Sequence, residues 1–593
     1  MNLRTLNDVF FSIIQRDQPR VIVYRKDEAW IPISAQELRL QIMRLSQALL
    51  NWGIRKGDRI AILSENRPEW AVADFASLLV GAVVVPIYAT LTAEQTAYVL
   101  RNSGARIVFA SSEKQLKKIC EIRAQTSLEK IVVMDSAPLV GSDIVLMQDI
   151  AEDVTVERKA EIDALAHAVG PEDLATIIYT SGTTGTPKGA MLTHGNMAAN
   201  LSCSLRGFDL NPGDVSLSFL PLSHVTARHV DYAMLYHGVT ICYVPFLDSL
   251  PRALNEIRPT ILVSVPRLYE KIHTQVELKA KKFPKRQIYR WALSVGKAYR
   301  NETLAGRLPT SFSWNLASRL LFSKVRAGLG GRVRIFISGG APLGRELAEW
   351  YANVGIRIHE GYGLTETSPV IAVNSPEAHK IGTVGKPLAN IEARIADDGE
   401  ILVRGPSIFP GYWNKPDETQ AVFNGDWFKT GDIGNLDADG FLSVTDRKKD
   451  LIKTSGGKFI APQPIENSLK HNAFVAEAVV LGDKHKFPAA LISPNFVVLE
   501  DWARNNGVAF SSRQELVADG KTQALYEAIV DVATKDLARF EKLKKVILVA
   551  DEFTSDNGLL TASMKMRRRV VEERYRQRIA DMYARAEESG PAS

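Results

Sequence analysis

The residue types best suited to chemistry lie in one short stretch, residues 177–189, which reads IIYTSGTTGTPKG. Its β-branched apolar start predicts a buried strand, and three glycines, five hydroxyl side chains and one lysine follow directly. Glycines let backbone N–H groups turn inward, and the hydroxyls and the lysine add donors and positive charge. This combination suits an oxyanion such as a polyphosphate. The residues expected to bind phosphate are Thr180, Ser181, Gly182, Thr183, Thr184, Gly185 and Lys188.

Two alternatives to this phosphate loop follow from its composition. A Walker A loop is excluded, because no Gly-Lys-Ser/Thr sequence closes the stretch. A plain Ser/Thr/Gly surface loop is the other interpretation.

The segment YTSGTTGTPKG resembles the signature of the AMP-forming adenylating enzymes, which include acyl-CoA synthetases, luciferases and peptide-synthetase adenylation domains. Later segments extend the resemblance over nearly the whole chain, and they are most similar to bacterial long-chain fatty acyl-CoA synthetases. The resemblance implies ATP and CoA as co-substrates and Mg²⁺ as cofactor. It also implies catalytic roles for Lys188, Glu366, His224 and Lys565.

Two further stretches each run from a strand into a glycine turn. In residues 333–344 (VRIFISGGAPLG), small residues leave room for a planar ring against the backbone, and the resemblance places adenine there. In residues 358–369 (IHEGYGLTETSP), Tyr362 offers a stacking face and Glu366 a carboxylate, which near ATP suits a magnesium ligand together with Thr180. A glycine-flanked turn with a surface glutamate is the alternative. The nucleotide-binding residues expected here are Gly339, Gly340, Ala341, Glu360, Gly361, Tyr362, Gly363 and Thr365.

Residues 427–466 contain a second group of polar residues. Asp432 is expected in a Thr-Gly-Asp turn, where its carboxylate could accept hydrogen bonds from paired hydroxyls such as those of a ribose. Asp437, Asp439 and Gly440 predict a hairpin turn, because the spacing after them does not fit an EF-hand. The charged run 447–453 (RKKDLIK) suits a hinge between domains.

The resemblance gives this region and the C-terminal part their roles. It implies that Arg447 contacts ribose, that Lys449 is the hinge position and that Lys453 lies near nucleotide phosphate. It implies that CoA's pantetheine arm passes the turn formed by Ser455, Gly456, Gly457 and Lys458. Lys565 aligns with the family's catalytic lysine, although on its residues alone it is one cation in a basic cluster.

Two features between residues 221 and 329 concern the acyl substrate and a surface. A lone histidine such as His224 is more often structural, but the resemblance places it beside the acyl and adenylate site. Ala227 precedes Arg228 where those enzymes often have an acidic residue, which leaves the shape of the acyl pocket open. The helical stretch 279–329 is basic, which is typical of a solvated face, or of contact with an anionic membrane or with CoA phosphates. Its clustered cations are Lys279, Lys281, Lys282, Lys285, Arg286 and Arg290.

The elements that must position these residues follow a βαβ rhythm. Helical spacing alternates with short apolar runs between residues 36 and 110, which predicts a layered α/β fold with helices on both faces of a sheet. We expect a large N-terminal domain of layered βαβ subdomains with a small β-barrel-like subdomain, followed by a small mobile α+β domain. The expected boundaries are 1–446 for the fatty acid and ATP site, 447–453 for the hinge and 454–593 for the mobile domain.

Bulk properties limit the class of protein. A chain of 593 residues should divide into at least two domains. Its net charge of +6 is mild and argues against a nucleic-acid partner. Three cysteines without paired spacing indicate a reducing compartment. The N-terminus does not read as a signal peptide, and the longest apolar run, Leu78 to Ala89, is too short to span a bilayer.

Together these observations predict a cytoplasmic long-chain fatty acid–CoA ligase, with any membrane contact peripheral on the inner membrane surface. A fatty acyl-AMP ligase that transfers to a carrier protein is the alternative within the superfamily. A non-catalytic lipid- or nucleotide-binding paralogue is the alternative from another class. The sequence leaves the oligomeric state open.

Overall fold

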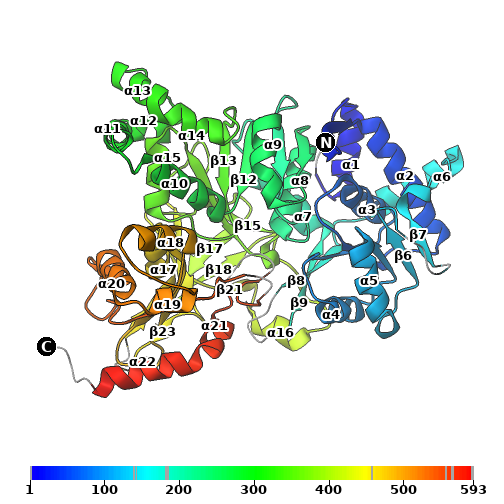
Figure 1. Cartoon of the computed structure of the whole chain (residues 1–593). Coiled ribbons are helices and arrows are strands. Elements are labelled where there is room, and N and C mark those ends of the chain that lie inside the picture. The colour runs from blue at the N-terminus through cyan, green and yellow to red at the C-terminus, as the bar shows by residue number, and fades with distance from the viewer. Residues whose placement is uncertain are drawn as a thin grey trace.

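The computed structural model of the chain describes residues 3–137, 141, 143–180, 186–455, 458–554, 557–561 and 566–588. Figure 1 shows two large β-sheets with helices packed around them, and a smaller C-terminal part beside them. This is the mixed α/β architecture that the βαβ rhythm predicts.

The first large sheet has eight strands, and its centre is parallel. At one side of the sheet, β8 (Leu174–Thr180) and β9 (Lys188–Thr193) form an antiparallel pair that flanks the predicted phosphate loop. In spatial order its strands are β19 (Gly411–Tyr412), β9 (Lys188–Thr193), β8 (Leu174–Thr180), β4 (Val83–Ile87), β3 (Arg59–Leu63), β5 (Ile107–Ala110), β6 (Lys130–Val133) and β7 (Ile144–Leu146). Its helices are α2 (Ala35–Asn51), α3 (Pro68–Leu79), α4 (Ala93–Ser103), α5 (Glu113–Ile122), α6 (Val156–Ala168) and α7 (His194–Ser204).

The second large sheet has nine strands and a parallel centre with antiparallel strands at both edges. In spatial order they are β16 (Lys386–Pro387), β15 (Val370–Val373), β14 (Ile358–Gly363), β13 (Ile335–Ser338), β12 (Ile261–Ser264), β10 (Val215–Ser218), β11 (Thr240–Tyr243), β1 (Ile22–Lys26) and β2 (Ala29–Ile33). The helices around it are α1 (Asn7–Arg16), α8 (Val225–Tyr236), α9 (Leu250–Ile257), α10 (Pro266–Ala280), α11 (Lys285–Ala298), α12 (Arg300–Leu304), α13 (Phe312–Ala317), α14 (Ser323–Gly328) and α15 (Arg345–Asn353).

One hydrophobic core joins the two sheets. It contains Ile62 of the first sheet, Ile261 of the second and the side chains of α3 between them. Every residue of α3 except Glu69 is buried, which explains why its sequence is apolar on all sides. The side chain of Asn200 on α7 donates to the carbonyls of Thr367 and Val370, and so ties the first sheet to the segment that follows β14.

The rest of the chain forms smaller sheets. An antiparallel sheet contains β17 (Glu392–Ile395), β18 (Glu400–Arg404), β20 (Phe423–Asn424), β21 (Trp427–Leu436) and β22 (Leu442–Arg447), with α16 (Pro416–Ala421) beside it. The C-terminal part contains β23 (Ile452–Lys453), β24 (Phe459–Ile460), β25 (Val475–Leu481), β26 (Ala489–Pro494) and β27 (Val546–Leu548). Its helices are α17 (Pro462–Lys470), α18 (Phe496–Asn505), α19 (Arg513–Ala518), α20 (Gly520–Thr534), α21 (Arg568–Arg574) and α22 (Arg576–Glu588).

The C-terminal part docks on α10 and α15 through charged groups. Arg267 at the start of α10 forms an ion pair with the buried carboxylate of Glu477 on β25 and donates to the carbonyl of Ala476. His471, just after α17, lies 3.0 Å from the carboxylate of Glu346 on α15. Polar contacts of this kind are typical of domains that can change their relative orientation.

Three expectations can be compared with the fold directly. Residues 437–440 form the turn between β21 and β22, as the hairpin interpretation predicts. The expected turn at Asp432 is wrong: Asp432 lies inside β21, although the strand is irregular after Ile433 and Gly431 has a φ of +73°. Cys120, Cys203 and Cys242 are all free thiols and form no disulfide.

No helix in the part of the chain that the structure describes is both long and apolar enough to cross a membrane. The longest apolar run, Leu78 to Ala89, instead forms the end of α3 and the buried strand β4.

Candidate active site

Three predicted nucleotide residues meet at the carboxyl end of β14. The hydroxyl of Tyr362 donates to Asp432 Oδ2 at 2.7 Å, and Arg447 Nε lies 3.5 Å from Asp432 Oδ1. Asp432 and Arg447 are paired across β21 and β22, so the antiparallel register places them side by side. Burial and the Asp432 carboxylate raise the pKa of Tyr362, which keeps its hydroxyl protonated as a donor. An aromatic face beside an acceptor and a cation suits a nucleoside.

Glu360 lies two residues earlier on β14 and is buried. Its Oε1 accepts a hydrogen bond from the backbone N–H of Leu343 at 2.9 Å, which connects it to the turn 339–344 after β13. Burial raises the pKa of Glu360 to about 7. β13 and β14 are parallel neighbours, so Gly339, Gly340 and Ala341 lie at the same sheet edge as Tyr362. Ligands of open α/β sheets bind at the carboxyl ends of such strands.

Two predicted catalytic residues meet through Tyr412, which the sequence analysis did not select. The Tyr412 hydroxyl donates to Glu366 Oε1 at 2.7 Å, and Lys188 Nζ lies 5.2 Å from the centroid of the Tyr412 ring. Lys188 also forms an ion pair of 2.6 Å with Glu418 on α16. Burial and the Glu366 carboxylate raise the pKa of Tyr412, so the phenol remains a donor. No local spacing relates Tyr412 or Glu418 to Lys188, and their roles follow only from tertiary packing.

The loop that begins at Thr180 is positioned by the pairing of β8 with β9, in which Thr180 lies opposite Lys188. Ser181, Gly182, Thr183, Thr184 and Gly185 lie outside the described residues. The register brings the two ends of the loop together, because a strand and its antiparallel neighbour meet at a turn.

The donor set fits a magnesium ion shared with phosphate. Magnesium takes one or two carboxylates together with phosphate oxygens and waters. Glu366, oriented by Tyr412, supplies one carboxylate, and Thr180 supplies a hydroxyl at the end of β8. Among the described residues, His, Cys, Asp and Glu form no group of three or more that could hold a metal. The protein side of such a site is therefore a single carboxylate and a hydroxyl.

His224 is the N-cap of α8, and its Nδ1 accepts a hydrogen bond from the N–H of Thr226 at 3.2 Å. It is half-buried, so it has at least a structural role.

One turn further along α8, Arg228 pairs with an acidic residue from another segment, although the preceding position, Ala227, is not acidic. It forms a buried ion pair with Asp74 of α3 and donates to the hydroxyl of Thr176 on β8 at 2.7 Å. The Asp74–Arg228 pair thus joins α3, α8 and the strand that leads to the phosphate loop. The sequence alone does not indicate it, because 154 residues separate the two side chains.

The predicted hinge position directly follows the nucleotide group in the chain, and the predicted CoA residues lie further on, beyond β23. Arg447 ends β22, and Lys449 follows in the connection to β23. The ammonium group of Lys453 lies 5.5 Å from the centroid of the Phe459 ring. The backbone N–H of Lys453 donates to the Asp483 carboxylate at 3.2 Å, and both contacts lie within the C-terminal part. Ser455 and Lys458 flank the turn between β23 and β24. Gly456, Gly457 and Lys565 lie outside the described residues.

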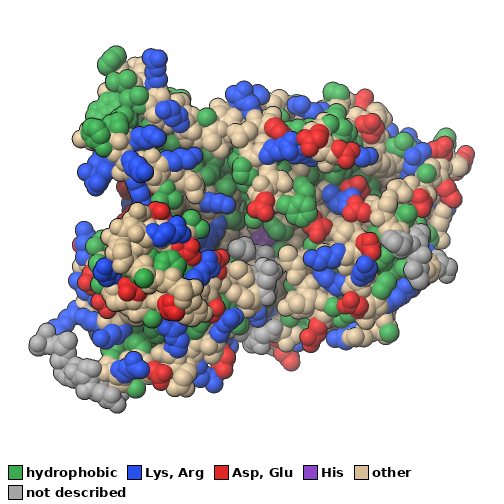
Figure 2. Space-filling view, viewed as in Figure 1, with side chains coloured by type: hydrophobic (Ala, Val, Ile, Leu, Met, Phe, Trp, Pro, Cys, Tyr) green, Lys and Arg blue, Asp and Glu red, His purple; other side chains and the backbone are tan. Residues whose placement is uncertain are grey.

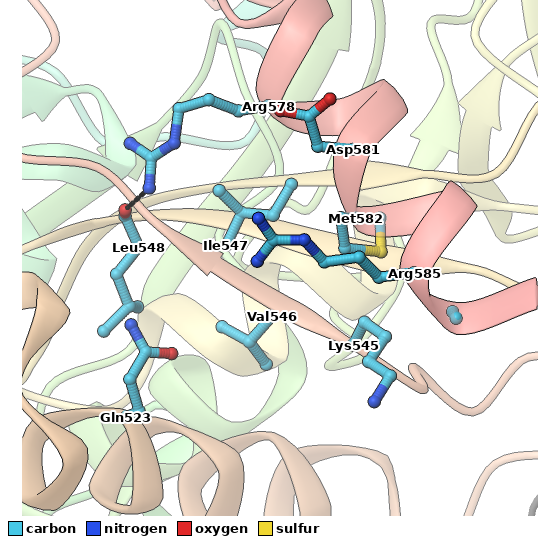
Figure 3. A pocket seen from close by; sticks show the side chains of 10 residues that line it. Gln523, Lys545, Val546, Ile547, Leu548, Arg578, Asp581, Met582 and Arg585 are labelled. Carbon is cyan, nitrogen blue, oxygen red and sulfur yellow. Dashed lines mark hydrogen bonds between the residues drawn. The ribbon is translucent and has the colours of Figure 1, made fainter. Parts of the chain in front are cut away.

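A cavity of about 370 Å³ lies elsewhere, between β27, α20 and α22 (Figure 3). Arg578 reaches across it to donate to the carbonyl of Leu548 at 2.9 Å, and Lys545 and Arg585 also line it. None of the predicted site residues lines this cavity.

Comparisons with known protein families cover most of the chain. The family model "AMP-binding enzyme" matches residues 13–413, and the model "AMP-binding enzyme C-terminal domain" matches residues 449–587.

Known proteins are similar over nearly their full length. A protein of Mycobacterium bovis named long-chain-fatty-acid–CoA ligase FadD15 is 38% identical over 577 residues, which are 96% of this chain and 95% of the relative. The peroxisomal long chain acyl-CoA synthetase 7 of Arabidopsis thaliana is 33% identical and is matched over 92% of this chain and 81% of its own.

Solved structures share the fold at lower identity. The adenylation domain of a carboxylic acid reductase from Segniliparus rugosus, in complex with AMP and a co-purified carboxylic acid, has a TM-score of 0.75 at 21% identity. The match covers 98% of this chain and 94% of that domain. The anthranilate CoA ligase AuaEII, in complex with anthranoyl-AMP, has a TM-score of 0.72 at 20% identity, over 97% and 98% of the two chains. These likenesses concern the fold, which is that of adenylate-forming enzymes.

Proposed function

The chain belongs to the family of AMP-binding enzymes, and on that premise we propose that it is an AMP-forming long-chain fatty acid–CoA ligase. It joins a fatty acid to CoA with ATP, through an acyl-adenylate, and releases AMP and pyrophosphate. The long-chain substrate class rests on the names of relatives that match over nearly the full length of both chains.

The observation that supports this function best is the spacing along one segment. Tyr362 joins the Asp432 and Arg447 group, and Glu366, four residues later, joins the Tyr412 and Lys188 group. Four residues span at most about 14 Å. The two groups therefore lie within reach of one ATP molecule, which supports the proposal.

The first half-reaction requires that two anions approach each other. A carboxylate oxygen of the fatty acid attacks the α-phosphorus of ATP, and the bond to the pyrophosphate oxygen breaks. Cations and N–H donors around the α-phosphate lower this barrier. We assign Lys188 and the loop 180–189 to the phosphates, and Tyr362, Asp432 and Arg447 to adenosine.

Magnesium would be held by Glu366 and Thr180 together with the phosphates, and would neutralise part of the triphosphate charge. Tyr412 keeps the Glu366 carboxylate in place for this task.

The second half-reaction uses the C-terminal part. The CoA thiol attacks the acyl carbon of the adenylate, AMP leaves with the bridging oxygen, and the thiol proton is released. We assign Lys565 to adenylate formation, Lys449 to the hinge, Lys453 to nucleotide phosphate, and Ser455 to Lys458 to the path of CoA. Rotation about Lys449 would exchange Lys565 for the CoA turn at one site. The polar docking of the C-terminal part on α10 and α15 supports such a motion.

The cellular setting follows from the same chemistry. We propose that the enzyme acts in the cytoplasm, since its three unbonded cysteines suit a reducing compartment. A bilayer surface would be its source of long-chain fatty acid.

The experiment is a pyrophosphate-release assay with ATP, Mg²⁺ and a panel of fatty acids, with and without CoA. We expect CoA-dependent turnover on long-chain acids, and its loss in Glu366→Gln. A single burst that CoA does not extend would contradict the ligase and favour an acyl-AMP ligase. No pyrophosphate with any fatty acid would favour a binding protein.

A further inference from the structure

Four exposed apolar side chains form a cap on the helices α11 and α13 and the link before α13. Phe312 is 84% exposed, Leu308 59%, Leu316 38% and Trp291 37%. We call these four residues the apolar cap. α11 packs against α13, and Figure 2 shows hydrophobic side chains gathered at the projecting end where Figure 1 places these helices.

These four side chains do not contribute to the hydrophobic core beneath α13. The inner face of α13 already packs through Trp314 and Ala317, which are both buried. Trp314 contacts the rings of Tyr299 and Phe322, at centroid distances of 6.1 and 4.9 Å. Phe312 and Leu316 therefore add a second apolar face that points to solvent. Contiguous exposed apolar side chains mark an interaction site.

The charges along the helical stretch that carries the cap are almost all of one sign. Residues 279–326 contain twelve lysines and arginines and a single acidic residue, Glu302. Ten of the twelve are exposed; Arg300 and Arg326 are half-buried. Exposed cations close in sequence to the cap include Arg290, Lys297, Arg307 and Arg319, and we call these four the basic rim. Figure 2 shows Lys and Arg side chains over the surface next to the cap.

We propose that the cap and its rim dock the protein on an anionic lipid bilayer. Aromatic and leucine side chains beside lysine and arginine suit the interface, where the apolar groups enter the acyl boundary and the cations meet anionic headgroups. Charge complementarity selects this partner, because a protein partner would have to supply a matching acidic surface around an apolar socket. The choice of a bilayer rests in part on the proposed function, whose acyl substrate partitions into lipid.

The test is co-sedimentation with vesicles of phosphatidylglycerol and phosphatidylcholine, without ATP or CoA. Wild type should bind these vesicles at low salt, bind less at high salt, and bind pure phosphatidylcholine weakly. Leu308→Ser with Phe312→Ser should weaken binding at least about tenfold. Arg290→Gln with Lys297→Gln and Arg307→Gln should weaken it on the order of a hundredfold, from about fivefold for each cation.

A matched control replaces two apolar residues that are equally exposed elsewhere, Val497 (80%) and Val532 (70%). Val497→Ser with Val532→Ser should leave vesicle binding unchanged. Equal binding by wild type and the cap variant overturns the proposal, as does the absence of binding by wild type. If wild type is a dimer and the cap variant is a monomer, with no change in vesicle binding, the cap would instead be assigned to self-association.

Vesicle binding and pyrophosphate release are separate measurements, so they test the bilayer proposal and the proposed catalytic function independently. Pyrophosphate release with a fatty acid in detergent-free solution should be the same in wild type and in both variants. Failure of vesicle binding would leave that turnover intact, and failure of turnover would leave vesicle binding intact.

Discussion

Tyr412 is the residue that joins the predicted catalytic groups. Its hydroxyl holds Glu366 and its ring lies beneath Lys188, so one side chain orients both a carboxylate and a cation. A hydrogen bond to a charged group contributes about 1.5–3 kcal/mol. Orientation of the proposed magnesium ligand should therefore depend on the phenol oxygen.

Tyr412→Phe removes this hydrogen bond and keeps the ring. We expect the Mg²⁺ concentration for half-maximal pyrophosphate release to rise about tenfold or more, with the fold unchanged by circular dichroism. Tyr289→Phe, which removes a half-buried hydroxyl that accepts from Trp350 between α11 and α15, is the control. An unchanged Mg²⁺ requirement in Tyr412→Phe would refute the positioning role.

Glu360 predicts a pH dependence of stability. Burial raises its pKa from 4.5 to about 7, so the folded protein favours the protonated carboxyl. Its contribution is therefore greatest below the unfolded pKa, is lost as pH rises from about 4.5 to 7, and stays constant above. Asp231, whose pKa burial also raises to about 7, acts in the same direction.

Glu360→Gln keeps the acceptor for Leu343 and removes the charge. Relative to wild type it should be more stable at pH 8 by up to roughly 3 kcal/mol, and nearly equal at pH 4.5. Calorimetric unfolding at both pH values measures the difference, with the exposed Glu392→Gln as control. A variant that is less stable than wild type at pH 8 would show that the carboxylate is ionised without cost.

The sequence indicated several residues that the structure brings together in two groups, but not the contacts that orient them. Lys188, Glu366, Tyr362 and Asp432 stand in long motifs whose types indicate their chemistry. Tyr412, Glu418 and Asp74 come from other segments, and only the folded chain brings them near. The roles of all these residues stay predictions, and residues 181–185 and Lys565 also lie outside the described residues.

At the scale of elements, α22 supports the proposed CoA turn through the link between β25 and β26. The ring of Tyr583 on α22 stacks on His485, with 3.6 Å between centroids and 1° between planes. The carbonyl of His485 accepts the N–H of Ser455, and the N–H of Lys484 donates to Lys453. Hence a side chain of the last helix positions residues 453–455.

Tyr583→Leu should loosen this turn. We expect the KM for CoA to rise about threefold to tenfold, while the pyrophosphate burst without CoA keeps its wild-type rate. Tyr583→Phe retains the stack and should behave as wild type. An equal decrease in both half-reactions for Tyr583→Leu would indicate a general folding defect and contradict the positioning role.

Elements with strong periodicity were predicted well. The alternation expected between residues 36 and 110 is confirmed by α2, β3, α3, β4, α4 and β5, which follow one another in this order. The pairing of distant strands into two sheets, with β1 beside β11, could not be predicted, because hydrophobic periodicity gives a strand's faces and not its neighbours.

For the whole molecule, the relative position of the C-terminal part depends on a few charged contacts. Arg267 and Glu477 are 210 positions apart, so no local pattern indicates their pairing. The Glu477 side chain is buried and that of Arg267 is 39% exposed, so removal of Arg267 leaves a buried carboxylate without its cation, which is unfavourable.

Arg267→Gln should therefore release the C-terminal part from α10. We expect trypsin to cleave the lysine- and arginine-rich connection 447–453 about tenfold faster than in wild type, and small-angle scattering to give a larger radius of gyration. Arg404→Gln, which breaks an exposed pair with Glu392, should change neither quantity. Wild-type cleavage kinetics in Arg267→Gln would show that contacts other than the Arg267–Glu477 pair hold the two parts together.

The most direct test of the account follows the oxygen atoms of the fatty acid. With ¹⁸O in both carboxylate oxygens, turnover with ATP, Mg²⁺ and CoA should transfer one ¹⁸O to AMP for each acyl-CoA formed. The transfer is expected because the carboxylate oxygen that attacks the α-phosphorus leaves with AMP when the thiol attacks the acyl carbon. AMP that contains no ¹⁸O while acyl-CoA accumulates would contradict an acyl-adenylate and the function proposed for this site.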